Sequence, residues 1–186
     1  MAYRIIQNTA TDACCLIVED RKEDCYYVAF RGTSTTTNAM DDLKMNLVPF
    51  TMDEYLRNRT SYQGVFVHAG FQRVYLSIRE ELCALLTSLL QHRRRKIRTT
   101  GHSLGGALAT LFSFDAVTRL CDPRDIAVTT FGSPRVGNRS FANMFRDHVR
   151  CAWRVANQFD GVTRVRATVT CCAFVPSRIF PYHVRF

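Results

Sequence analysis

Glycine residues flank a serine in the segment Gly101-His102-Ser103-Leu104-Gly105, and this spacing is suited to covalent catalysis. A G-x-S-x-G pattern between a strand and a helix holds the serine at the tip of a sharp turn, with its hydroxyl group exposed. Gly101 and Gly105 avoid collisions where the strand and the helix meet. The amide of Leu104 points to the place where a negatively charged oxygen would form in acyl transfer. We therefore predict that Ser103 is a nucleophile and that Leu104 supplies one oxyanion donor.

The residues on both sides of this turn favour a functional interpretation. A short run beginning at Lys96 is a candidate strand, and the residues after Leu104 repeat apolar positions at helical spacing. A further glycine, Gly106, follows the pattern directly. In the simpler alternative, Ser103 only caps the helix. That alternative leaves the glycines on both sides of the serine unexplained.

Strands and helices alternate along the rest of the chain, which indicates an α/β fold with a largely parallel sheet. Runs rich in β-branched and aromatic residues predict strands at Cys14–Val18, Cys25–Phe30, Val65–His68, Ile126–Phe131 and Cys151–Ala156. Apolar residues spaced by three and four predict helices from Phe71 to Leu89, from Leu104 to Val117 and over Ser140–His148. The polar stretch Thr51–Gly64 has no period and is predicted to be a loop.

Together with four other segments, Gly101–Gly106 resembles the class 3 (fungal-type) lipase family. The other segments follow the order of that family: Phe30-Arg31-Gly32-Thr33, Asp41–Leu47, Val67–Phe71 and Thr130–Asn138. The resemblance is strongest over residues 25–160. It implies an α/β-hydrolase fold, with a mostly parallel central sheet flanked by helices, and we expect one such domain over residues 1–186.

The resemblance also assigns a role to Thr33, which follows an apolar strand and the glycine of a turn. It makes Thr33 the second oxyanion donor, through its amide and its hydroxyl group, beside Leu104. Residues 34–47 would form the lid that this family places over its site. Because the start of that segment is polar, we expect weak activation at lipid interfaces.

A serine nucleophile needs a base and an orienting carboxylate, which this fold supplies in the order Ser, Asp, His. Among the acids after Ser103, Asp160 alone follows a predicted strand at the carboxyl edge of the sheet. It also matches the acid of the family, although Gly161 replaces the usual branched residue. We therefore predict that Asp160 is the orienting carboxylate. The other acids lie in helices or in a surface turn: Asp115, Asp122, Asp125 and Asp147.

The identity of the base has two solutions. His183 is the only histidine after Asp160, so it is one candidate. However, Phe180–Val184 more closely resembles a family segment that precedes the catalytic histidine, and Arg185 replaces the glycine expected there. The second solution is a C-terminally truncated copy whose base lies beyond Phe186. His102 is too close to Ser103 to fold back as its base.

The amino-acid composition limits which other classes of protein this chain can belong to. Apolar residues make up 47% of the 186 residues and charged residues 22%, an ordinary globular balance. The longest strongly apolar stretch has nine residues, too few for a membrane span, and no secretory signal is seen, so we expect a cytoplasmic protein. The eight cysteines form no C-x-x-C pair, and we expect reduced, mostly buried thiols, no metal and no cofactor.

The formal net charge of +9 raises the question of a nucleic acid or membrane partner. The run Arg93–Lys96 is predicted to be a solvated helix end rather than a nucleic-acid patch, because the other arginines are scattered. Transient contact with an anionic membrane surface is a better use of this charge.

Two functions follow. In the first, the protein hydrolyses lipid carboxylic esters, as an acylglycerol lipase does, through an acyl-enzyme on Ser103. In the second, the catalytic histidine is missing, and an inactive or impaired hydrolase fold binds lipid or a protein partner. A nucleotide-binding function lacks the glycine-rich loop G-x-x-x-x-G-K-[ST] in this sequence.

Overall fold

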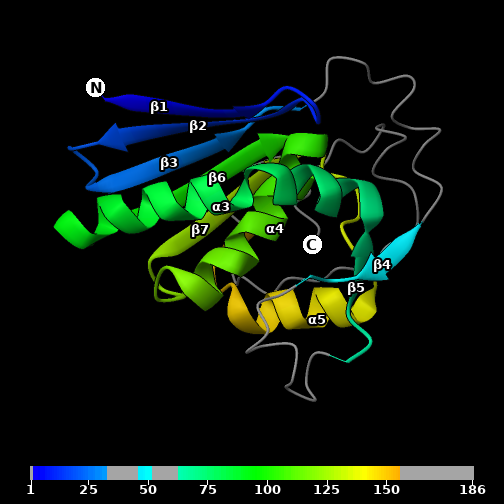
Figure 1. Cartoon of the computed structure of the whole chain (residues 1–186). Coiled ribbons are helices and arrows are strands. Elements are labelled where there is room, and N and C mark those ends of the chain that lie inside the picture. The colour runs from blue at the N-terminus through cyan, green and yellow to red at the C-terminus, as the bar shows by residue number, and fades with distance from the viewer. Residues whose placement is uncertain (1, 33–45, 52–62, 156–186) are drawn as a thin grey trace.

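The computed structural model describes residues 2–32, 46–51 and 63–155, and Figure 1 shows helices packed against a twisted sheet. The strands are β1 (Tyr3–Asn8), β2 (Ala13–Asp20), β3 (Cys25–Phe30), β4 (Leu47–Pro49), β5 (Phe66–His68), β6 (Lys96–His102), β7 (Ile126–Phe131) and β8 (Ala152–Val155). The helices are α3 (Ala69–His92), α4 (Leu104–Arg119) and α5 (Arg139–His148).

The central sheet has the strand order β1-β2-β3-β6-β7-β8. The neighbours β3, β6, β7 and β8 run parallel, whereas β1 and β2 add an antiparallel edge. The mostly parallel sheet predicted from the alternation of strands and helices is therefore present. Because β3, β6, β7 and β8 are parallel, their carboxyl ends share one edge of the sheet, which is where such folds place their sites.

One face of the sheet forms the core. In β6, the buried residues Ile97, Thr99 and Gly101 alternate with more exposed ones, the period expected when one face of a strand is covered. Figure 1 shows α3 and α4 lying over the sheet, α3 across the antiparallel side and α4 across the parallel side. Large apolar side chains on the opposite face stay exposed: Tyr3, Ile5, Leu16, Tyr27 and Phe131.

The predicted helices are confirmed, with boundaries close to those expected. In α3 the apolar stripe that includes Tyr75, Ile78 and Leu82 is buried against the sheet and α4. Helix α4 buries residues on nearly all sides, including Leu108 and Phe112, because the sheet, α3 and α5 surround it. A helix that is apolar on all sides is what such a central position requires.

Two strands were not predicted. β1 is an edge strand in which only Ile6 is buried, so its side chains show no alternation of apolar and polar residues. β4 has three residues and pairs only with β5, which is too short a segment to give a periodic signal. Most of the loop predicted over Thr51–Gly64 lies outside the described residues.

A buried ion pair joins α3 to α4. The Arg79 guanidinium lies 2.6 Å and 2.9 Å from the two carboxylate oxygens of Asp115, and the Tyr75 hydroxyl donates to the same carboxylate at 2.6 Å. Burial, followed by the nearby Asp115 charge, raises the pKa of Tyr75 well above its usual range, so the phenol remains a donor. Asp115, one of the acids after Ser103, is thus committed to holding two helices together.

The basic run after α3 differs from the solvated helix end that we predicted. Arg93 and Arg94 are exposed, but the Arg95 side chain is only 8% exposed and pairs with Glu19 at 2.7 Å and Asp24 at 3.2 Å. The run therefore fixes the β2–β3 hairpin to the start of β6.

The described cysteines carry free thiols, and Cys15, Cys25 and Cys83 are buried as predicted, whereas Cys14, Cys121 and Cys151 are half-buried. Burial raises the pKa of Cys15 to about 12 and that of Cys83 to about 11. Within the described part of the chain, no helix is long and apolar enough to cross a membrane.

Replacement of Arg79 by Met should lower the free energy of unfolding by about 3–5 kcal/mol, because Asp115 would stay buried with its carboxylate uncompensated. Urea-induced unfolding followed by fluorescence would measure this loss. The matched control is Arg94→Met, which breaks the pair with Asp125 at a guanidinium that is 72% exposed and should cost much less. Equal losses in the two variants would contradict a stabilising role for the α3–α4 pair.

Candidate active site

Ser103 occupies the turn between β6 and α4 in a backbone conformation that side chains rarely adopt. Its φ is 53° and its ψ is −123°. Holding a non-glycine residue there costs about 1–3 kcal/mol and persists only where the surroundings enforce it. The Ser103 amide donates to the Phe131 carbonyl at the end of β7, at 2.9 Å. The sharp turn predicted from the glycine pattern is therefore present.

The Ser103 side chain makes no capping hydrogen bond to α4. This finding argues against the alternative in which the serine is only a helix cap. The side chain is partly exposed, whereas the neighbouring helix residues from Gly105 to Ala109 are buried. The serine is thus less buried than the helix that follows it, and its side chain does not cap that helix.

Three glycines allow the close contacts that enforce this turn. A β-carbon at Gly101 would collide with the backbone of Gly105, and one at Gly105 would collide with the Phe30 carbonyl oxygen. A β-carbon at Gly106 would lie 2.7 Å from that of Ser133, in the segment after β7. Strands β3 and β6 and helix α4 therefore meet without intervening side chains.

The amino end of α4 offers amide donors beside the Ser103 hydroxyl. The amides of Gly106 and Ala107 donate to the Ser103 carbonyl, at 2.9 Å and 3.3 Å. Helix geometry leaves the first amides, those of Leu104 and Gly105, without an acceptor inside the helix. The positive end of the helix dipole adds to their attraction for an anion.

The end of β3 lies against the same turn. A β-carbon at Gly32 would be 2.8 Å from the His102 carbonyl oxygen and 3.9 Å from the Ser103 β-carbon. Thr33 follows Gly32 directly, but it lies outside the described residues, as does the predicted lid up to residue 45. The described chain therefore reaches the elbow at Gly32, the residue directly before the predicted oxyanion donor Thr33.

Strand β8 brings a third chain segment to this edge. Val155 pairs with Phe131, and its carbonyl accepts from the Gly132 amide at 2.9 Å. In the sheet, β7 lies between β8 and β6, the strand that leads to Ser103. Asp160 and His183 lie outside the described residues.

The other acids after Ser103 are engaged elsewhere. Asp122 pairs with Arg124, and these hydrogen bonds lower the pKa of its carboxyl group. Asp125 pairs with Arg94 at the amino end of β7, the opposite end of the sheet from Ser103. Asp147 is exposed near the end of α5.

Two of the described histidines, His68 and His148, contact neighbouring residues of the fold. The His68 ring stacks on Phe71 at 4.3 Å between ring centroids, and burial lowers its pKa. His148 Nδ1 lies 2.8 Å from the Met144 carbonyl oxygen at the end of α5. His102 is exposed at the end of β6, beside Ser103 in the chain.

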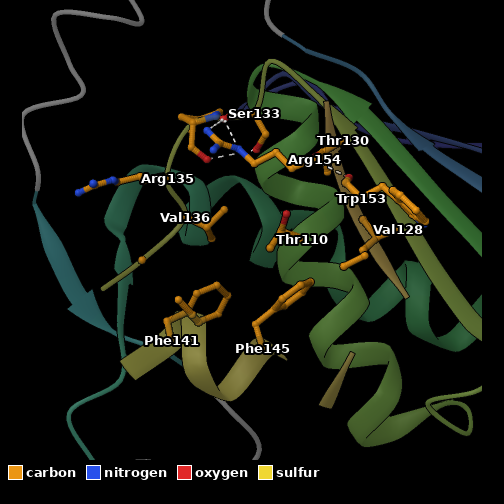
Figure 2. Close-up of a pocket in the computed structure, with 14 residues that line it drawn as sticks. Thr110, Val128, Thr130, Ser133, Arg135, Val136, Phe141, Phe145, Trp153 and Arg154 are labelled. Carbon is orange, nitrogen blue, oxygen red and sulfur yellow. Dashed lines mark hydrogen bonds between the residues drawn. The ribbon is translucent and has the colours of Figure 1, made fainter. Parts of the chain in front are cut away.

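A cavity of about 70 Å³ lies between α4, α5 and the two strands β7 and β8. Figure 2 shows Phe141 and Phe145 of α5 on one side and Thr110 of α4 on another. Ser133 and Arg154 lie at its upper rim, whereas the Arg135 side chain points away from it. Ser133 connects this rim to the elbow, because it contacts Gly106.

Known proteins share the sequence pattern and the fold of this chain. The sequence model of the family described as lipase (class 3) matches residues 27–170. The chain belongs to the class 3 lipase family. Its α/β-hydrolase fold is shared with solved fungal lipases, as the resemblance implied.

Three proteins show the extent of the similarity between this class 3 lipase chain and known enzymes. It is 32% identical to the phospholipase A1 DAD1 of Arabidopsis thaliana, covering 76% of this chain and 34% of that protein. It superposes on the lipase of Rhizopus microsporus var. chinensis with a TM-score of 0.76, 27% identity and coverage of 89% and 56%. A triacylglycerol lipase whose catalytic centre is formed by a serine protease triad gives a TM-score of 0.74, 30% identity and coverage of 88% and 60%. The chain spans about a third of the curated relatives that it matches.

Two site features were not found from the sequence. The contact of Gly32 with the elbow depends on β3 and β6 being neighbours, which the sequence did not specify. The position of Arg154 at the rim of the cavity was also missed. Its location in the predicted strand Cys151–Ala156, which leads toward Asp160, was the available signal.

Replacement of Gly105 by Ala should destabilise the fold by about 1–3 kcal/mol, because the added methyl group would meet the Phe30 carbonyl and force the backbone apart. Thermal unfolding would measure the change. Gly70→Ala is the control, since its methyl group would lie 3.2 Å from the His68 ring rather than against backbone. A Gly105→Ala protein as stable as Gly70→Ala would show that the close approach at the elbow is not required.

Proposed function

We propose that this protein is a serine hydrolase of lipid carboxylic esters that forms an acyl-enzyme on Ser103. The observation that carries the proposal is the strained backbone of Ser103 at a meeting point of β3, β6 and α4. This serine is followed by helix amides that have no acceptor inside the helix. The relatives of this protein supply the chemistry, since they include a phospholipase A1 and triacylglycerol lipases.

The reaction begins when the Ser103 oxygen attacks the acyl carbon of the ester and a histidine accepts the hydroxyl proton. The amides of Leu104 and Thr33 stabilise the negative charge on the carbonyl oxygen. The C–O bond to the alcohol then breaks, and the histidine returns its proton to the departing alcohol. Water, activated by the same histidine, hydrolyses the acyl-enzyme and regenerates the serine.

Asp160 is the acid that we propose to orient this histidine. Two strand spacings, about 10 Å, separate β8 from β6. Asp160 follows Val155 by five residues, whose extended chain spans up to about 17 Å. The proposed acid is therefore within reach of the edge where Ser103 lies.

The base in this proposal is His183 or a histidine of a longer protein. If neither serves, the alternative function applies: an inactive hydrolase fold that binds lipid or a protein partner. Loss of the histidine lowers turnover by several powers of ten and leaves only the contribution of the oxyanion hole. The two functions are therefore separated by the reactivity of Ser103.

Labelling with a fluorophosphonate probe, which forms a covalent bond to activated serines, tests the proposal. Wild-type protein should be labelled and should hydrolyse a p-nitrophenyl ester, whereas Ser103→Ala should lose the label and nearly all hydrolysis, about 10⁶-fold in turnover for a complete triad. Mass spectrometry of the labelled peptide should place the adduct on Ser103. Equal labelling of both proteins would refute Ser103 as the nucleophile.

Variants of the proposed partners identify the triad in the same assay. Asp160→Asn and His183→Ala should each slow labelling, while His92→Ala, at the end of α3, is the control and should not. If His183→Ala labels at the wild-type rate, His183 is not the base. Wild-type protein that is folded but not labelled would favour the binding function.

We also propose transient contact with an anionic membrane surface, supported by the net charge of +9. The run Arg93–Arg95 forms intramolecular ion pairs, so this attraction depends on the net charge rather than on that run. Co-sedimentation should show binding to phosphatidylglycerol-containing vesicles that is lost on adding salt. Equal binding to neutral phosphatidylcholine vesicles would contradict an electrostatic contact.

A further inference from the structure

Arg154, on the edge strand β8, holds the backbone of the segment that follows β7. Its Nε and Nη2 atoms both donate to the Ser133 carbonyl oxygen, at 3.2 Å and 2.7 Å. Figure 2 shows the guanidinium reaching over the rim of the cavity to this carbonyl. Hydrogen bonds from a charged donor are stronger than those between neutral groups. The two hydrogen bonds from Arg154 therefore hold the Ser133 carbonyl firmly in place.

Ser133 transmits this contact to the elbow. The residue is only 2% exposed, and its β-carbon lies where a side chain at Gly106 would stand. The Gly106 amide in turn donates to the Ser103 carbonyl at 2.9 Å. A short path of packed atoms therefore runs from the guanidinium through Ser133 and Gly106 to the strained serine.

The Ser133 side chain does not hold the segment in place of Arg154. Its hydroxyl group donates to the carbonyl of the adjacent Pro134, at 3.2 Å, a contact within the segment itself. The contact from Arg154 is different, because it ties the segment to β8. Backbone pairings also join β7 to β8, with Gly132 donating to Val155 at their ends, and the Thr130 hydroxyl donates to the Trp153 carbonyl at 3.5 Å.

We infer that Arg154 is a positioning residue for Ser103: it presses the segment after β7 against the amino end of α4 and so sets the direction of the serine hydroxyl. This inference rests on the proposed function of Ser103. Arginine suits the task because its planar fork directs two donors at once, whereas lysine would offer a single point charge. Arg154 also lies on the strand that precedes the proposed acid in the chain, so one side chain couples the serine to that strand.

Kinetics of fluorophosphonate labelling test the inference. Arg154→Met should lower the maximal labelling rate constant between about 10- and 100-fold, the effect of a small misplacement of a reacting group. The probe concentration giving half-maximal rate should stay unchanged, because Arg154 does not contact the probe. Arg154→Lys should recover part of the rate.

The matched control is Arg98→Met, which removes another half-buried arginine from a strand of the same sheet, away from the elbow. It should label at the wild-type rate even if its thermal stability falls as far as that of Arg154→Met. Methylguanidinium should accelerate labelling of Arg154→Ala, since the space left opens onto the cavity, and should not accelerate labelling of Arg98→Ala.

The outcomes separate this inference from the proposed function. Wild-type labelling at Ser103 with equal rates in Arg154→Met and Arg98→Met would overturn the positioning role alone. Absence of wild-type labelling would overturn the proposed function, and amide hydrogen exchange would then decide the role of Arg154. Faster exchange over residues 101–107 in Arg154→Met than in Arg98→Met would support it, and equal exchange would refute it.

Discussion

The close approach of three backbone segments at Ser103 is the constraint on which the rest of the site depends. β3 supplies the Phe30 carbonyl, β6 supplies Gly101, and α4 begins at Leu104, with Gly105 packed between them. No side chain fits in this space, so the chain must turn within one residue. That residue is a serine whose φ is positive, and the strain is balanced by packing and backbone hydrogen bonds around it.

Such a turn needs rigid surroundings, and the described residues supply them from both sides. The buried pair of Arg79 with Asp115 joins α4 to α3, while α5 and the strands enclose the rest of α4. Arg154 ties the segment after β7 to β8, and that segment packs against Gly106. Charged side chains thus have structural tasks at each end of the helix that follows the serine.

The ion pairs of the basic run show that a cluster of charges in the sequence does not by itself reveal the role of those charges. The run from Arg93 to Lys96 is the most basic stretch of the sequence, yet its ion pairs join the β2–β3 hairpin, α3 and the start of β7. Each partner is distant in the chain, so the neutralisation is invisible along the sequence. The run lies at the amino end of β6, and the serine lies at the carboxyl end of that strand.

The elbow, the helices and the central strands could be predicted from the amino-acid sequence, because each has a local physical cause. Glycines at fixed spacing around Ser103 permit one kind of turn, and apolar residues at periods of two or 3.6 specify which face of a strand or helix is buried. The family resemblance added roles for Thr33, Asp160 and His183, which the described residues do not test.

Which distant segments meet became known from the folded chain. It placed Gly32 against the elbow, paired Asp115 with Arg79, and brought the Arg154 guanidinium to the Ser133 carbonyl. It also showed β1 as an edge strand whose sequence lacks alternation. The reason is physical: strand order and helix packing are set by the summed burial of many side chains, and no local pattern contains that sum.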